Sequence, residues 1–190
     1  MEAERVMAMT KTKLHSVLPY IGIPVIGAAM LIFREVRANQ FLTLQYGLLI
    51  IFGYVTAVRD VKTMKIPNNL ILAMLAAWIL LIMPKLFFDT DAAIILLISS
   101  ALGFAIGGGL FLLVYLISRK GLGGGDVKFM AAAGLYLGYG GVLSAMLCGT
   151  IIAAITGLAL ILLKKINRKD PMPLAPFLYA GILITVFIVF

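Results

Sequence analysis

Two aspartates, Asp60 and Asp126, stand where acidic side chains could do chemistry. Asp60 ends one long apolar run and Asp126 begins another, whereas the remaining acidic residues lie in tails and loops. An acid beside a membrane helix is costly enough to be a functional-site hypothesis by default. Two carboxylates that lie close together share a proton, so one can activate water while the other acts as a general acid. The pair therefore predicts an aspartic dyad.

The loop before Asp126 is rich in glycine, including Gly123 and Gly125. Glycine permits positive φ and the close approach of another backbone, which suits a loop that admits a peptide. If Asp126 begins a helix, the helix dipole favours its carboxylate. The stretch lacks the GxxxxGK[ST] spacing of a phosphate-binding loop. A flexible hinge with an incidental acid is the alternative.

A second segment, Ile66-Pro67-Asn68, follows Asp60 at short range. Proline fixes its own φ and restrains the residue before it, and asparagine is a good helix N-cap. The segment therefore predicts a rigid entry into the next helix. A simple loop turn is the alternative.

No other side chain competes for a catalytic role. The single cysteine, Cys148, lies inside an apolar run, the single histidine, His15, lies in the N-terminal tail, and no serine stands in a nucleophile motif. One cysteine can build neither a disulfide nor a paired-cysteine metal site. We therefore predict no metal and no cofactor.

The elements that must position the two aspartates are membrane helices. The chain is 63% hydrophobic and 13% charged, against about 25% charged in a soluble domain. Its apolar runs are continuous rather than alternating, which favours helices over a β-barrel. They cover 17–33, 41–58, 66–83, 92–117, 127–139, 142–163 and 174–190. We predict an all-α, polytopic membrane bundle of six to seven helices, forming one domain over 1–190 with 1–16 as a cytoplasmic tail.

The net charge of +8 comes from short basic clusters between the apolar runs. This pattern indicates membrane topology rather than a nucleic-acid surface. When the basic residues are sorted onto alternate sides of seven spans, all but Arg34, Arg37 and Lys85 fall on one side. Because basic loops stay inside, we predict a multi-pass protein of the cytoplasmic membrane. Its N-terminus and both aspartates would face the cytoplasm.

Taken together, the motifs resemble the type IV prepilin peptidase family, which are membrane aspartic proteases of the GxGD type. The similar elements are Asp60 with the downstream Ile66-Pro67-Asn68, the stretch 123–128 as the family's GxGDxK, and the proline-rich stretch 173–178 as the entry to its last helix. The resemblance implies that Asp60 and Asp126 are catalytic. Gly123, Gly125, Pro67, Asn68 and Lys128 would support the loop or bind substrate.

The resemblance also implies a substrate. It would be a prepilin-like, pseudopilin-like or preflagellin-like protein with a basic leader and an apolar N-terminal helix, cleaved at the cytoplasmic face of the bilayer. Longer family members carry a zinc-binding region with paired cysteines that accompanies N-methylation. This sequence has no such pair, so it is similar to the short, peptidase-only form.

Three alternatives remain open. A protease of the presenilin and signal peptide peptidase type also uses a GxGD aspartate, although here Arg59 precedes Asp60 and the late motif begins at Pro173. A transporter would place its acids near the middle of helices rather than at their ends. A non-catalytic assembly factor could keep the same fold.

Overall fold

The structure is a computed structural model that describes residues 40–118, 121–164 and 172–189. The described residues from Leu44 onward belong to one compact unit. The predicted tail 1–16 and the first predicted helix, 17–33, lie outside the described residues.

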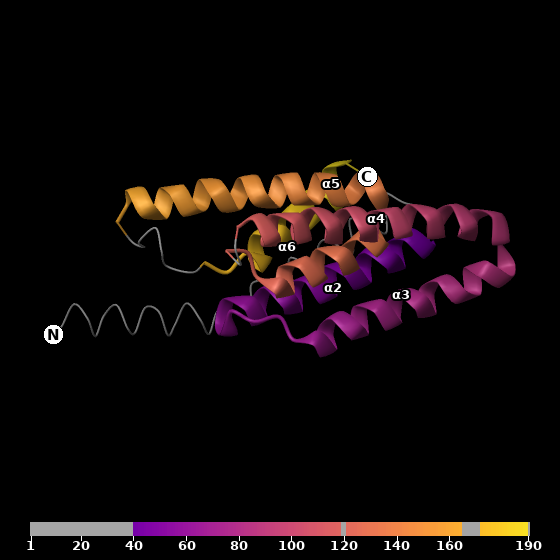
Figure 1. Cartoon of the computed structure of the whole chain (residues 1–190). Coiled ribbons are helices and arrows are strands. Elements are labelled where there is room, and N and C mark those ends of the chain that lie inside the picture. Colours follow the sequence, from indigo (N-terminus) through magenta and orange to yellow (C-terminus); the bar gives the residue numbers. More distant parts are fainter. Residues whose placement is uncertain (1–39, 119–120, 165–171, 190) are drawn as a thin grey trace. The chain divides into compact units, whose positions relative to one another are not determined.

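Every regular element among the described residues is helical (Figure 1), which confirms the all-α prediction. The elements are α2 Gln40–Thr63, α3 Asn68–Phe88, α4 Thr90–Ile117, α5 Gly124–Leu162, α6 Ala175–Ile184 and a π-helical turn, η1 Thr185–Val189.

Four of these helices, α2 to α5, are long and apolar enough to cross a membrane. The shortest has 21 residues, and at about 1.5 Å per residue it reaches across a hydrocarbon core of about 30 Å. Many large apolar side chains are exposed on them, for example Leu80 at 73% and Ile95 at 70%. The chain is therefore an integral membrane protein with at least four such helices among its described residues.

The long helix α5 is interrupted at Gly138, where φ is 67° and ψ is −177°. A Cβ placed on Gly107 of α4 would lie 2.5 Å from the carbonyl oxygen of Met130 and 2.9 Å from Cγ2 of Val142. On a straight helix those two residues would be about 18 Å apart. The chain therefore reverses at Gly138, and Figure 1 shows two ribbons for α5. We call residues 124–137 the first arm and 139–162 the second arm.

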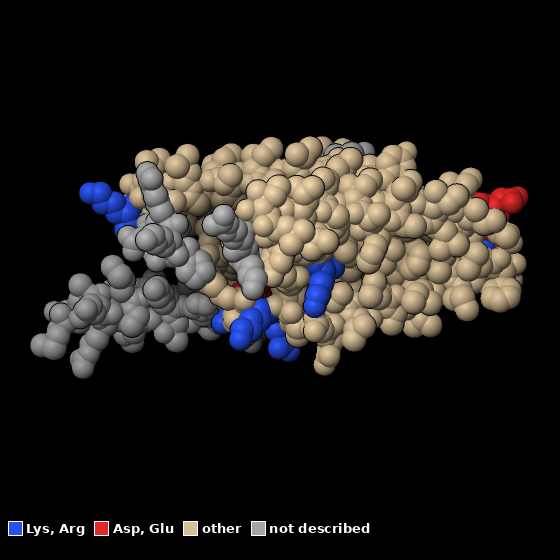
Figure 2. All heavy atoms as spheres, viewed as in Figure 1, with Lys and Arg blue, Asp and Glu red and all other residues tan. Residues whose placement is uncertain are grey.

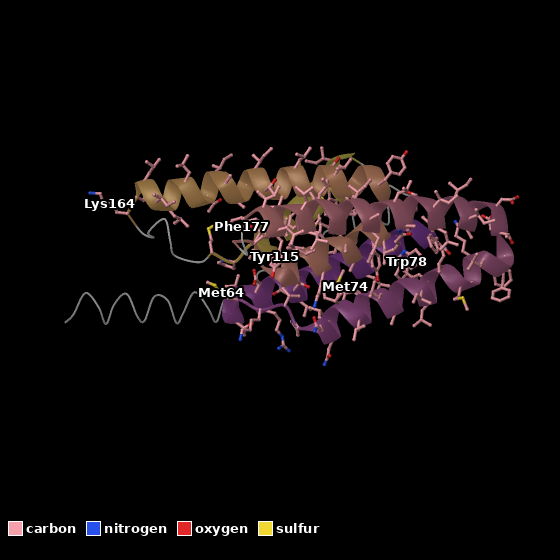
Figure 3. All side chains as sticks on the ribbon, in the orientation of Figure 1. Met64, Met74, Trp78, Tyr115, Lys164 and Phe177 are labelled. Atoms are coloured by element: carbon pink, nitrogen blue, oxygen red, sulfur yellow. The ribbon has the colours of Figure 1, made fainter. Side chains whose placement is uncertain are left out.

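Glycines allow the helix backbones to pack closely around the first arm. A Cβ on Gly103 of α4 would overlap the carbonyl oxygen of Gly134, and one on Gly107 would lie 2.5 Å from that of Met130, both on the first arm. On the second arm, the carbonyl oxygen of Ala145 would be overlapped by a Cβ on Gly181 of α6. Phe129 and Tyr136 of the first arm are almost fully buried. From α3, Met74 and Trp78 point toward the interior (Figure 3). The first arm is thus enclosed by its neighbours.

Candidate active site

Asp60 lies near the end of α2 and is only 6% exposed. Its Oδ2 atom accepts a hydrogen bond from the backbone N–H of Ala175 at 3.0 Å. Ala175 is the first residue of α6, and the first N–H groups of a helix have no partner within the helix. The proline-rich entry to α6 therefore supplies a backbone donor to Asp60. The sequence had marked this motif, but it had not indicated Ala175 as the partner.

Asp126 lies in the first turn of α5 and is 7% exposed. Its carboxylate sits against Gly123, where an added Cβ would come within 2.6 Å of Oδ2. Its other oxygen, Oδ1, is buried and has no hydrogen-bond partner among the described residues. Gly123 thus provides room for Oδ2 of Asp126, while Oδ1 remains available for a ligand.

The fold brings the two aspartates together from motifs that are far apart in the sequence. The charge of Asp60 acts electrostatically on Asp126, although they belong to different helices, α2 and α5. Each side chain is buried, and burial weakens the dielectric screening between two charges. The arrangement has two features expected of an aspartic dyad: carboxylates that interact electrostatically, and shelter from bulk solvent near helix ends.

The two motifs also contact each other through their flanking residues. A Cβ on Gly125 would lie 2.9 Å from Cβ of Ile66, so the backbones approach closely there. Lys128 Nζ donates a hydrogen bond to Asn68 Oδ1 at 3.0 Å. These contacts fix the start of α3 against the start of α5.

The predicted helix entry at 66–68 is correct in outline, but the predicted cap is wrong. The N-cap residue of α3 is Pro67, with φ −71° and ψ 139°, and no side chain caps the helix. Asn68 is the first helical residue, and its side-chain oxygen accepts from Lys128 instead. The proline fixes the chain direction one residue earlier than expected, which frees the asparagine for the contact with α5.

Exposed basic residues surround the site. Arg59 and Lys62 lie near the end of α2, Lys65 follows it, and Lys128 lies on the first turns of α5. Figure 2 shows Lys and Arg gathered toward one end of the described molecule and acidic residues at the opposite end. Those acids are Asp89, the N-cap residue of α4, and Asp91 in its first turn.

Among the described residues, no three His, Cys, Asp or Glu side chains are grouped so that they could hold a metal ion. Cys148 lies on the second arm and is partly exposed, while His15 lies outside the described residues.

Residues 47–162 match the model of the type IV leader peptidase family. This chain belongs to that family. The matched segment contains both Asp60 and Asp126, and it covers the glycine loop and the helix entry that hold them.

Curated relatives agree with this assignment. A prepilin leader peptidase/N-methyltransferase of Bacillus subtilis is 33% identical over 128 residues, covering 67% of this chain and 48% of the relative. One from Burkholderia pseudomallei is 31% identical over 134 residues, covering 67% and 41%. One from Aeromonas salmonicida is 36% identical over 63 residues, covering 33% and 22%. The chain spans at most about half the length of these relatives. No solved structure matches it significantly.

Proposed function

We propose that this protein is a membrane aspartic endopeptidase that removes the basic leader from prepilin-like, pseudopilin-like or preflagellin-like substrates. The observation that carries the proposal is the meeting of Asp60 and Asp126, two buried carboxylates from separate motifs, on the helices that the family model matches. The curated relatives are named prepilin leader peptidase/N-methyltransferase, which supports the proposed cleavage of a leader.

In the proposed mechanism the two carboxylates share one proton. The ionised carboxylate takes a proton from a water molecule as the water oxygen attacks the scissile carbonyl carbon. At the same time the protonated carboxyl donates its proton to the carbonyl oxygen. Collapse of the tetrahedral intermediate breaks the C–N bond. The carboxyl that took the proton from water gives it to the leaving nitrogen, and the other carboxylate takes a proton back from a hydroxyl of the intermediate, which restores the shared proton. Asp126 Oδ1, buried and without a partner among the described residues, is the atom available to bind the attacking water.

The residues around the dyad hold it in place and bound the substrate path. Gly123 and Gly125 admit the carboxylate of Asp126 and the side chain of Ile66 at distances that a larger residue would prevent. Pro67 sets the direction of the chain into α3. Lys128 and Asn68 join the two helix starts. We assign these residues supporting roles rather than roles in bond breaking.

The proposed topology places the dyad at the cytoplasmic face of the cell membrane. Among the described residues, the end that carries the dyad also carries Arg59, Lys62, Lys65, Lys128 and Lys164, and the opposite end carries Lys85. This bias supports a cytoplasmic site by the positive-inside rule. We propose that α2, α3, α4 and the shorter α6 cross the membrane, and that the two arms of α5 enter from the cytoplasmic face and return to it, with their break at Gly138 inside the bundle. Run 17–33 would provide the seventh helix of a single domain, 1–190, with 1–16 in the cytoplasm.

Cleavage of a peptide that spans a leader junction tests the proposal directly. Asp60→Asn and Asp126→Asn should each abolish cleavage while leaving the protein inserted, and the double variant should be no worse than either single one. Asp91→Asn is the matched control, because it makes the same change at an exposed acid on the opposite end. Substantial cleavage by either dyad variant would remove the proposed mechanism and favour a transporter or a non-catalytic role.

A further inference from the structure

The far end of the first arm lies inside the bundle. A Cβ on Gly103 of α4 would come within 2.7 Å of the backbone of Gly138, and Gly103 is near the middle of α4, which runs from Thr90 to Ile117. The first arm itself, residues 124–137, is about 20 Å long at 1.5 Å per residue. That is shorter than the hydrocarbon core of about 30 Å. The helix that carries Asp126 therefore ends within the membrane-spanning part of the protein.

A helix end in that place leaves carbonyl groups to be satisfied. The last four carbonyls of a helix have no partner within it, and an unpaired backbone group away from water costs several kcal/mol. The break at Gly138 puts Leu135 and Tyr136 among those last residues. Water has little access to this turn, because Tyr136 is 1% exposed and the next residue, Leu137, is 4% exposed.

Side chains from two other helices satisfy these two carbonyls. Gln45 of α2 donates from Nε2 to the carbonyl oxygen of Tyr136. Ser100 of α4 donates from Oγ to that of Leu135 at 2.6 Å. Gln45 is 2% exposed and Ser100 is fully buried. A third bond, from Tyr136 Oη to the carbonyl oxygen of Met74 at 2.6 Å, ties the same turn to α3.

We propose that Gln45 and Ser100 are positioning residues for the dyad, because their hydrogen bonds fix the depth and rotation of the short helix that carries Asp126. This inference rests on the proposed function. A slip of one residue along a helix turns its side chains by about 100°. Asp126 lies ten positions before Tyr136 on the same arm, so such a turn at the far end would carry its carboxylate away from Asp60.

The restraints at the near end leave rotation to be set elsewhere. Near Asp126 the first arm is tied to α3 by the exposed bond from Lys128 to Asn68 and by the contact of Gly125 with Ile66. A long, exposed lysine can follow a moving partner. Gln45 and Ser100 are short or buried side chains without such freedom, so their hydrogen bonds define where the arm ends and how it is turned.

The test compares two variants that remove a buried donor with one that does not. Ser100→Ala and Gln45→Met each leave a carbonyl of the break without its donor. Ser144→Ala is the matched control, because the Ser144 hydroxyl bonds only the carbonyl of Gly140 four residues earlier in its own helix, which the Ser144 N–H can also serve. Kinetics are normalised to the monodisperse, inserted protein, and Asp126→Asn is measured alongside.

A misplacement of about 1 Å costs about 100-fold in rate. Each variant removes one of the two donors and should displace the carboxylate by less, so we expect Ser100→Ala and Gln45→Met each to lower kcat by about 10-fold. KM should stay within about 2-fold, and Ser144→Ala should match the unmodified protein. The two pH limits of activity should also move closer together, because carboxylates that are farther apart interact less. A purely structural role would lower the folded amount without moving those limits.

Two results would overturn the inference. One is a kcat and a pH profile for Ser100→Ala that match those of Ser144→Ala. Because Ser100→Ala removes a single oxygen atom, this variant decides the question even if Gln45→Met does not fold. The other is a loss of activity in Ser100→Ala and Gln45→Met that disappears when the rate is divided by the amount of monodisperse, inserted protein. If Asp126→Asn is inactive in the same assay, the proposed function stands and the positioning role alone has failed. If Asp126→Asn is active, the proposed function itself has failed.

Discussion

Replacing Gly125 by alanine should lower the activity of the dyad while leaving the protein folded. Gly125 precedes Asp126, and a Cβ there would lie 2.9 Å from Cβ of Ile66, 3.3 Å from its Cγ1 and 3.5 Å from its Cδ1. At the neighbouring Gly124, a Cβ would meet Tyr115 Cε2 at 4.0 Å, an ordinary contact. Alanine at Gly125 therefore creates a steric conflict beside the site, and alanine at the adjacent Gly124 does not.

The size of the effect follows from these distances. Carbon atoms in contact prefer about 3.5–4.0 Å, so the Gly125→Ala variant is short of space by roughly 0.6–1.1 Å. Rotation of the Ile66 side chain cannot relieve this, because Cβ is bonded directly to the backbone. The segment around Ile66 or the first turn of α5 must move by about 1 Å. A displacement of that size costs about 100-fold in rate, or about 2.7 kcal/mol of activation free energy.

Cleavage kinetics and thermal unfolding of the purified variants provide the measurement. Gly125→Ala should lower kcat by about 10- to 100-fold with little loss of folded protein. Gly124→Ala should keep full activity and should be as stable as the unmodified protein or more so, by about 0.5–1 kcal/mol. Equal activity in the two variants would show that the contact between Gly125 and Ile66 does not position Asp126, and the reasoning from distance would then be wrong.

Three further predictions concern topology, pH and the exposed contact beside the dyad. Cysteines placed at Thr63 and Leu122, in a Cys148→Ser background, should resist a membrane-impermeant thiol reagent in intact cells and react after lysis; labelling before lysis would reverse the proposed orientation. The dyad needs one protonated and one ionised carboxylate, so activity should fall below a lower pH limit, where both are protonated, and above an upper limit, where both are ionised; a pH–rate profile of kcat with a single limit between pH 3 and 9 would contradict a coupled pair. Lys128→Met and Asn68→Ala should each reduce kcat/KM by a few-fold, and a double-mutant cycle should show that the double variant is no worse than either single one, because both remove the same hydrogen bond; additive losses would mean that the two side chains act separately.

Much of the architecture could be predicted because lipid imposes a simple rule on sequence. Helices that cross a membrane need long apolar runs, so the predicted runs 41–58, 66–83 and 92–117 lie within or largely overlap α2, α3 and α4. The same rule made Asp60 and Asp126 conspicuous, since few acids border such runs. The count of six to seven helices stays a prediction, because four described helices are long and apolar enough to span.

The partners of the site residues could not be predicted in this way. Ala175 donates to Asp60 across 115 positions, and Gln45 donates to the carbonyl of Tyr136 across 91. Such pairs depend on which helices pack together, and periodic hydrophobicity does not carry that information when every face of a helix is apolar. Asn68 is a different case, in which a local rule gave a wrong prediction. The rule predicted Asn68 as the N-cap of α3, but its side chain instead accepts a hydrogen bond from Lys128 on another helix.

The position of the break in α5 explains why two kinds of restraint are needed at one dyad. Near the carboxylates, glycines remove side chains, so that Asp126 and Ile66 can approach the loop backbone. This permits the correct geometry but cannot enforce it, because an absent side chain holds nothing in place. At the far end of the first arm, the buried side chains of Gln45 and Ser100 make hydrogen bonds that the helix can keep in only one register. The glycines create the space in which Asp126 meets Asp60, and the buried donors determine that Asp126 is the residue that occupies it.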